Sequence, residues 1–153
     1  MLIETLFIFT MPTTAGYSST PLAKKLGIKE GFTIRLINQP SHYRSLFTDW
    51  PSAITIATGK KNKKNFLHFF TTSAEDLHRH LKDLKNEIVG NGIIWVSWPK
   101  KASRVSTDLT EDVIRQMALA IGLVDVKVCA VDETWSGLKL VIPVKDRQAI
   151  NRQ

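Results

Sequence analysis

The chain has 153 residues, of which 43% are hydrophobic and 23% are charged. This length fits one domain with a sizeable core, and the composition excludes the polar, poorly hydrophobic signature of a disordered protein. Lysine and arginine number 21 against 14 for aspartate and glutamate, so the formal net charge is +7. Such a charge suits nucleic acid, anionic lipid or an acidic partner, but it does not define chemistry. The single cysteine, Cys129, cannot form an internal disulfide, which favours a reducing, cytoplasmic location.

The first ten residues, MLIETLFIFT, are apolar but too short to span a bilayer, and they lack the basic start of a signal peptide. No other stretch resembles a membrane segment, so no membrane association is expected. The globular pattern begins only after Met11. We therefore expect residues 1–14 to be a tail, either disordered or preceding a natural start at Met11. Residues 15–146 then form a single domain, and residues 147–153 form a carboxyl-terminal tail.

The first elements are short and have clear end signals. LAKKLG is predicted to be a helix with Thr20 as its N-cap and Gly27 as its end. Alternating apolar residues make FTIRLIN a strand, and SHYRSLFTDW before Pro51 is expected to be a short helix. AITIA is the second predicted strand.

Longer elements follow a lysine-rich segment. GKKNKKN, residues 59–65, is predicted to be an exposed loop, and FLHFF after it a strand buried on both faces. A helix capped by Ser73 carries one apolar stripe, and Gly90-Asn91-Gly92 is expected to end it. IIWVSW is the next strand. It leads through WPKKAS into a helix whose expected N-cap is Asp108.

The last two predicted strands, VDVKVCAV and LKLVIPV, are joined by DETWSG. This turn is too short to hold a crossover helix, so the pair must be antiparallel. The chain order predicts an α/β, three-layer Rossmann-like fold, with helices on both faces of a mostly parallel sheet and a terminal antiparallel pair. The end of this order is similar to the carboxyl half of a class I methyltransferase fold, so the architecture is a truncated methyltransferase-like one.

Three long blocks resemble one bacterial family, catalogued as domain of unknown function 3052. They are GYSSTPLAKKLGIKEG, WPKKASRVSTDLTEDVIR and GLVDVKVCAVDETWSGLKLV, and the resemblance runs from Ala15 to about Val144. The family pattern has a glycine where this chain has Ser19, and the lysine segment and first ten residues lie outside it. The resemblance implies the fold and leaves the function open.

The sequence argues against an ordinary nucleotide cofactor. A methyltransferase or dehydrogenase of this fold uses a glycine-rich turn after its first strand, because only glycine lets the backbone approach the ligand closely. Here the first strand runs into LINQPSHY, where Pro40 removes a backbone donor, and no acidic residue ends AITIA to hold a ribose. No cofactor is therefore expected. The four histidines include no pair at i, i+4 spacing, so no metal site is expected either.

Ligands in open α/β sheets bind beyond the carboxyl ends of the parallel strands. If the terminal pair follows methyltransferase topology, the 132–137 turn opens on that edge beside residues 98–104. Lysines and a serine would then face acidic and polar side chains across one crevice, near a helix amino terminus. The candidate ligand-binding residues are Lys100, Lys101, Ser103, Asp132, Glu133, Trp135 and Ser136. Each also has a purely structural interpretation, as a solvated charge, a cap or a turn residue.

Three functions are consistent with these features. The first is a non-catalytic binding or regulatory module for an anionic small molecule or a protein partner. The second is an enzyme acting on an anionic small molecule, with Lys100 or Lys101 holding the anion and Asp132 or Glu133 as acid or base. The third is a basic protein that associates with nucleic acid through residues 59–65, weakly and with strong salt dependence.

Overall fold

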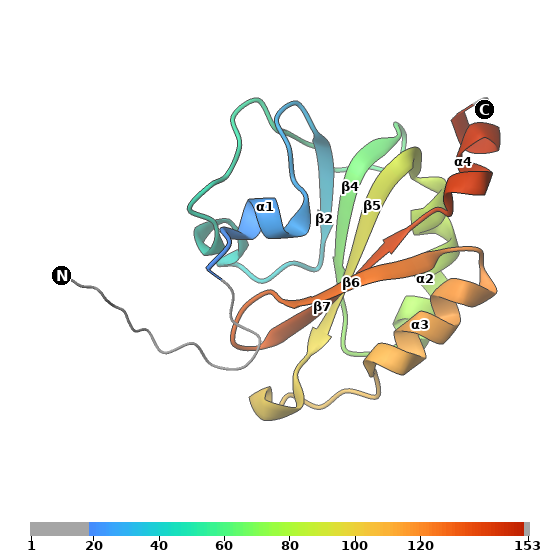
Figure 1. Ribbon diagram of the computed structural model, residues 1–153. Coiled ribbons are helices and arrows are strands. Elements are labelled where there is room, and N and C mark those ends of the chain that lie inside the picture. The colour runs from blue at the N-terminus through green and yellow to red at the C-terminus, as the bar shows by residue number, and fades with distance from the viewer. Residues whose placement is uncertain (1–18, 152–153) are drawn as a thin grey trace.

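The computed structural model describes residues 19–151 (Figure 1). The helical elements are α1 (Leu22–Leu26), η2 (Tyr43–Leu46), α2 (Ala74–Asn86), η3 (Lys101–Ser103), α3 (Glu111–Ala120) and α4 (Val144–Asn151), where η marks a 3-10 helix. The strands are β2 (Thr33–Ile37), β3 (Thr55–Ile56), β4 (Lys64–Phe70), β5 (Ile88–Pro99), β6 (Val124–Ala130) and β7 (Trp135–Val141).

All of these strands lie in one six-stranded sheet with the order β3-β2-β4-β5-β7-β6. Strands β3, β2, β4 and β5 run parallel, whereas β7 is antiparallel to both of its neighbours. The chain passes from β2 to β3 on one side and then crosses to β4 on the other. The predicted mostly parallel sheet with a terminal antiparallel pair is thus confirmed.

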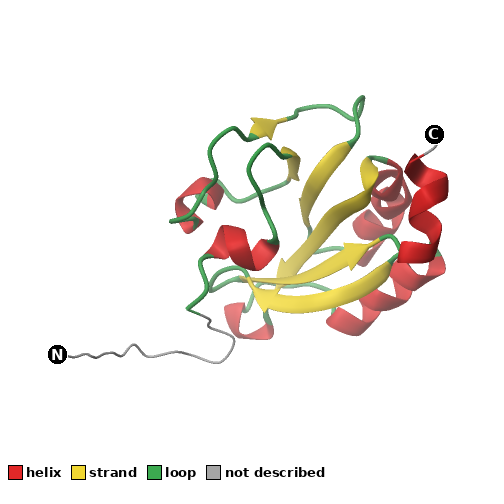
Figure 2. Ribbon diagram, turned by 45° about the horizontal axis from the view of Figure 1, so that its top comes forward, coloured by secondary structure: helices red, strands yellow, loops and turns green. Residues whose placement is uncertain are grey.

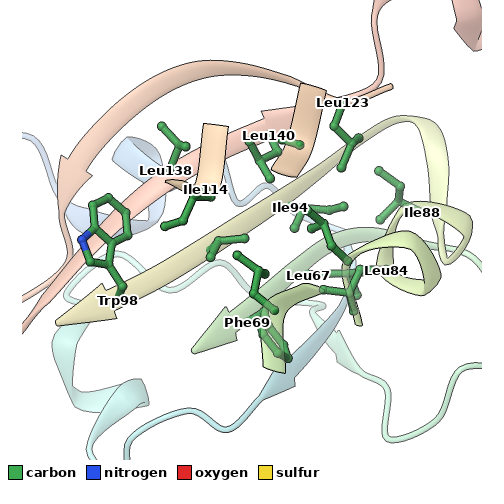
Figure 3. Packing of buried hydrophobic residues seen from close by; sticks show 14 of the residues in the cluster. Leu67, Phe69, Leu84, Ile88, Ile94, Trp98, Ile114, Leu123, Leu138 and Leu140 are labelled. Atoms are coloured by element: carbon green, nitrogen blue, oxygen red, sulfur yellow. The ribbon is translucent and has the colours of Figure 1, made fainter. Parts of the chain in front are cut away.

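Both faces of the sheet are covered, as Figures 1 and 2 show. Helices α2 and α3 cover one face, where Leu84 and Ile114 pack on the inward side chains of the central strands (Figure 3). On the other face, α1 and η2 enclose a second cluster that includes Leu26, Tyr43, Phe47, Phe66, Phe70 and Trp95. Successive strand residues point to opposite faces, so β4 contributes Leu67 and Phe69 to the first core and Phe66 and Phe70 to the second. The result is a three-layer domain.

The lysine-rich segment differs from the prediction. Lys64 and Asn65 belong to β4, and the Lys64 residue is only 1% exposed. Its ammonium lies 3.1 Å from the carboxylate of Glu87, which also accepts a 2.6 Å hydrogen bond from Arg35, and it donates to the carbonyl of Gly59. Buried charges persist only when they are paired and hydrogen-bonded. Residues 59–63 remain outside the regular elements and are exposed, as expected.

Helix caps also differ from those predicted. The carboxylate of Asp49 accepts the amides of Ala23 and Lys24 at the start of α1, at 3.0 Å each, so a residue distant in sequence supplies this cap. Helix α3 is capped by Thr110 rather than Asp108. The Asp108 carboxylate instead accepts the amide of Ala74 at the start of α2, 2.8 Å away. The caps predicted at Ser73 and Gly27 are confirmed.

Two segment boundaries need correction. Residues 90–92 do not form a turn after a helix, because β5 runs unbroken from Ile88 to Pro99 with an irregular register beside the start of β4. At the other end, α4 crosses the boundary predicted at residues 146–147, and Ile150 packs against the larger core. The apolar stretch 1–10 and the possible start at Met11 lie outside the described residues.

Among residues 19–151, no helix combines the length and apolar character needed to cross a membrane.

The buried ion pairs give a stability prediction. Replacing Glu87 by Gln leaves the buried Lys64 without its counter-charge, so the free energy of unfolding should fall by about 3–5 kcal/mol. The matched control is Asp112→Asn, which removes an ion pair between Arg115 and the Asp112 side chain, itself 87% exposed. This variant should lower the free energy of unfolding by about 1 kcal/mol or less. Urea unfolding measures both variants. Equal losses would show that the Glu87 pairs contribute no more than a surface contact.

Candidate functional site

The carboxyl edge of the parallel strands is the part of this fold where ligands are expected. The switch point lies between β2 and β4, because the chain leaves β2 toward one side and returns on the other. Just after β2, Asn38 adopts a left-handed φ of 59°, and its side-chain amide donates to the carbonyl of Phe70 at 3.3 Å. Asparagine tolerates this conformation better than most residues. The contact closes the loop after β2 against the end of β4.

A buried hydrogen-bond network holds η2 on this edge. The hydroxyl of Tyr43 lies 2.9 Å from Nδ1 of His68, and the hydroxyl of Ser97 lies 2.8 Å from Nε2 of the same ring. The His68 and Ser97 residues are 0% exposed. Burial lowers the pKa of His68 to about 3, so the ring is neutral and must donate with one nitrogen and accept with the other. Both hydroxyl groups are thereby matched, and η2 is fixed to β4 and β5.

Aromatic rings pack around the carboxyl end of β4, beside the switch point. The His68 ring stacks on Phe70 with centroids 4.2 Å apart, and Tyr43 meets Phe70 edge-on at 5.8 Å. Trp135 packs edge-on against the same Phe70 ring at 5.1 Å. These side chains belong to the core under η2 and lie next to the carboxyl end of β4, where an open α/β sheet would receive a ligand.

Methyltransferases of this fold bind S-adenosylmethionine at the carboxyl edge, and the residues of this chain at that position do not fit it. A glycine-rich turn after the first strand would let the backbone approach the ligand, but the chain has Asn38-Gln39-Pro40 there, and the buried Tyr43 lies just beyond. Strand β3 is followed by Ala57 and Thr58, which offer no carboxylate to hold a ribose.

The two segments predicted to share a crevice do lie side by side. Trp98 and Pro99 at the end of β5 pair with Ser136 and Trp135 at the start of β7. The amide of Lys100 donates to the carbonyl of Thr134 at 2.8 Å. Strand β7 therefore begins at Trp135, inside the turn predicted at residues 132–137.

Several of the candidate residues make structural contacts. The hydroxyl of Ser103 donates to the carbonyl of Lys100 at 2.6 Å and accepts the amide of Val105 at 3.2 Å, which shapes the η3 turn. Ser136 belongs to the ladder between β5 and β7, and Trp135 covers Phe70. These contacts explain Ser103, Trp135 and Ser136 without a ligand.

The charged candidates line different cavities. Lys101 lines a cavity of about 390 Å³ that extends from Trp98 to Glu111. Asp132 and Glu133 line a separate cavity of about 420 Å³ together with His42, Leu46, Val131 and Thr134. Asp132, Leu46 and Val131 also line a third cavity of about 330 Å³, which Lys25 and Thr20 border. The 98–104 segment is thus a neighbour of the acidic turn in the sheet, but Lys101 lines a different cavity from Asp132 and Glu133.

A histidine and a carboxylate meet at the second of these cavities. Nε2 of His42 lies 3.0 Å from Oδ2 of Asp132, although 90 positions separate the two residues. Oδ1 of Asp132 accepts the amides of Thr134 and Trp135, each at 2.8 Å. Partial burial alone would raise the pKa of Asp132, but the hydrogen bonds from His42, Trp135 and Thr134 outweigh it, so the pKa falls below its usual value. Asp132 is therefore an anion held in one orientation, with His42 beside it.

His42 and Tyr43 were not among the predicted site residues. They stand in SHYRSLFTDW, where apolar spacing indicated only a short helix. A polar pair in the loop that follows a strand, at the edge where ligands bind, was the available signal. Which acidic residue His42 would meet could not be read from local sequence.

The sheet order and the terminal antiparallel pair define a Rossmann-like domain with a methyltransferase-like fold. Among solved structures, magnesium protoporphyrin IX methyltransferase from Synechocystis PCC 6803 with bound SAH matches with a TM-score of 0.55 and 11% identity, over 78% of each chain. A SAM-dependent methyltransferase from Aquifex aeolicus matches with a TM-score of 0.53 and 14% identity, over 78% of this chain and 87% of that chain. Identities this low establish the fold alone.

The sequence itself matches the family described as protein of unknown function, DUF3052, over residues 60–144. Because this range is more than half of the 153 residues, the chain belongs to that family. The lysine-rich segment, which was expected to lie outside the family pattern, is almost wholly inside the matched range, whereas the block GYSSTPLAKKLGIKEG precedes it. No curated protein matches the chain in sequence.

The buried imidazole gives a pH prediction. Between its ordinary pKa of 6.5 and its folded pKa of about 3, the unfolded chain binds a proton that the folded state excludes. The free energy of unfolding should therefore decrease by up to about 1.4 kcal/mol for each pH unit as the pH falls through this range.

His68→Gln removes the titration while keeping one donor and one acceptor, so unfolding free energies measured between pH 7 and pH 5 should vary less steeply than in the wild type. His78→Gln, at an exposed position of α2, is the control and should leave the steepness unchanged. An unchanged slope in His68→Gln would show that this ring does not control the acid sensitivity.

Proposed function

We propose that this protein is a small-molecule-binding module with a methyltransferase-like fold, whose ligand occupies the cavities between η2 and the β6–β7 turn. The observation that carries the proposal is the placement of a fixed, ionised Asp132 at the border of two cavities. A few convergent polar groups in a concave, partly apolar site are typical of ligand binding.

The lining residues indicate the kind of ligand. Lys25 borders one side of the site, and its ammonium donates to the carbonyl of Ala130 at 3.1 Å. Asp132 and Glu133 border the other side and can accept hydrogen bonds. Leu46 and Val131 supply the apolar surface between them. This arrangement favours a small polar molecule that carries an anionic group together with a hydroxyl or amino group.

The size of the site also favours a small-molecule ligand. Cavities of about 330 and 420 Å³ stand at the lower end of the range of about 300–1,000 Å³ that is typical of small-molecule sites. Sequence reasoning favoured Lys100 and Lys101 as the anion-binding pair, and Lys25 now replaces them in the proposal because it shares a cavity with Asp132.

The enzymatic alternative is favoured by one specific observation, the 3.0 Å contact between His42 and Asp132. A histidine oriented by a carboxylate is a recurrent acid–base device. Binding and turnover at one site do not exclude each other, and binding is the part of the proposal tested first.

A thermal-shift screen against metabolites and nucleotides tests binding, because a ligand that binds only the folded state raises the Tm by mass action. At a ligand concentration of 100 times Kd, the stabilisation should be about 2.7 kcal/mol. Leu46→Trp, which narrows both cavities, should abolish the shift for any compound that produces one in the wild type.

The matched control is Leu119→Trp, at an exposed position of α3, which should keep the ligand response. The Tm of each variant without ligand shows whether it is folded. A compound that stabilises the wild type and Leu46→Trp equally binds elsewhere, and a broad panel without any response contradicts the proposal.

A further inference from the structure

We propose that the cavity lined by His42 and Asp132 is a hydrolytic site, in which His42 is the general base that activates water against an activated carbonyl group of a small ligand. The inference rests on the proposed function, because it assigns a reaction to the same site. The proposed hydrolysis needs no methyl donor.

The geometry fixes which nitrogen of His42 can act as the base. Both carboxylate oxygens of Asp132 are acceptors, so the 3.0 Å contact requires Nε2 of His42 to carry a hydrogen. In the neutral ring, the lone pair is then on Nδ1. The His42 side chain is 54% exposed and lines the cavity, whereas the Asp132 side chain is only 13% exposed. A shielded carboxylate therefore orients an accessible base, as in other carboxylate–histidine pairs.

The rigidity of Asp132 strengthens this assignment. Its second oxygen is held by two backbone amides of the β6–β7 turn, so the carboxylate cannot rotate away from the ring without losing both hydrogen bonds. The hydrogen bonds that lower its pKa also keep it charged, and a charged partner stabilises the imidazolium that forms during proton transfer. Asp132 is thus a positioning residue, and His42 is the residue that would contact the reacting water.

The loop that carries His42 is also fixed. Its neighbour Tyr43 is 2% exposed and is bound to the buried His68, and the carbonyl of His42 accepts the hydroxyl of Ser45 at 2.7 Å. A catalytic base needs to be held close to its productive position, and here the contacts of Tyr43 and Ser45 hold the backbone that carries His42. A surface ion pair between flexible side chains would not need a backbone fixed in this way.

The reaction step balances without a further reactant. Nδ1 of His42 accepts a proton from water while the water oxygen forms a bond to the carbonyl carbon. The bond from that carbon to the leaving oxygen then breaks, and the leaving group takes the electron pair. The imidazolium returns its proton to the leaving group or to solvent. The products are a carboxylic acid and an alcohol. Glu133 is the other titratable residue that lines this cavity, and Lys25 lines the adjoining one.

The probe for this activity is p-nitrophenyl acetate, a small activated ester, with the full chain at several pH values. The wild type should hydrolyse it with a kcat/KM at least about 100-fold above that of His42→Asn, because a positioned general base contributes about 10²–10⁴-fold. His78→Asn, an exposed histidine on α2, is the matched control and should retain wild-type activity.

Asp132→Asn separates proton transfer from a merely structural role. Its oxygen can still accept the amides of Thr134 and Trp135, but its NH₂ group donates to Nε2 of His42 and moves the imidazole hydrogen to Nδ1. The variant should stay folded with an unchanged Tm, within about 3 °C, and lose as much activity as His42→Asn. The double variant should be no slower than either single variant, because the two residues act as a unit. The wild-type rate should also fall in heavy water.

Equal rates for the wild type and His42→Asn would overturn the inference, as would an Asp132→Asn variant that is folded and fully active. Either result leaves ligand binding untouched, because the thermal-shift response of the wild type and of Leu46→Trp is measured separately. Conversely, ester hydrolysis that depends on His42 would stand even if no metabolite stabilised the protein.

Discussion

The fully buried His68 constrains the carboxyl edge of this domain. An imidazole without access to water must satisfy both of its ring nitrogens within the protein, since an unpaired buried polar group costs free energy comparable to a lost hydrogen bond. Tyr43 and Ser97 meet this need from opposite sides, at 2.9 and 2.8 Å. Because Tyr43 must stay in this position, the segment after β2 is held on the sheet, and the adjacent His42 is held near Asp132.

Strand β4, which carries His68, has a second buried polar side chain near its amino end. Lys64, four positions before His68 on β4, is buried against Glu87, and Arg35 from β2 completes the pairing. One end of the central strand thus depends on charges that compensate each other, and the other end depends on neutral hydrogen bonds. Between them, Phe66 packs into the core that α1 and η2 cover. The chain tolerates polar residues in its most buried strand because each one binds a partner from a neighbouring element.

Local patterns predicted much of the architecture. The buried run FLHFF and the leucine stripe of α2 follow from periodicity, and the short final turn required an antiparallel pair. The similarity to methyltransferase topology, rather than periodicity, predicted that the 98–104 and 132–137 segments lie on one edge. Local patterns could not show that Lys64 is buried, because a lysine in a lysine-rich run looks solvated until its partner 23 positions later, Glu87, is placed. Asp108 was assigned to the nearer helix for the same reason. The His42–Asp132 pair was missed because tertiary packing alone brings its members together.

The contact between His42 and Asp132 also has a consequence for the order of folding. It joins residues 90 positions apart, and Lys25 contacts the carbonyl of Ala130 across 105 positions. Contacts between residues so far apart in sequence carry a large loop-closure entropy cost. They can form only after pairing of the intervening strands has already brought the two ends of the loop together. The site therefore does not exist in any partly folded form in which the β6–β7 pair is detached. A molecule bound there would connect the first and last parts of the domain, and it would oppose sub-global opening of the terminal hairpin rather than local fraying.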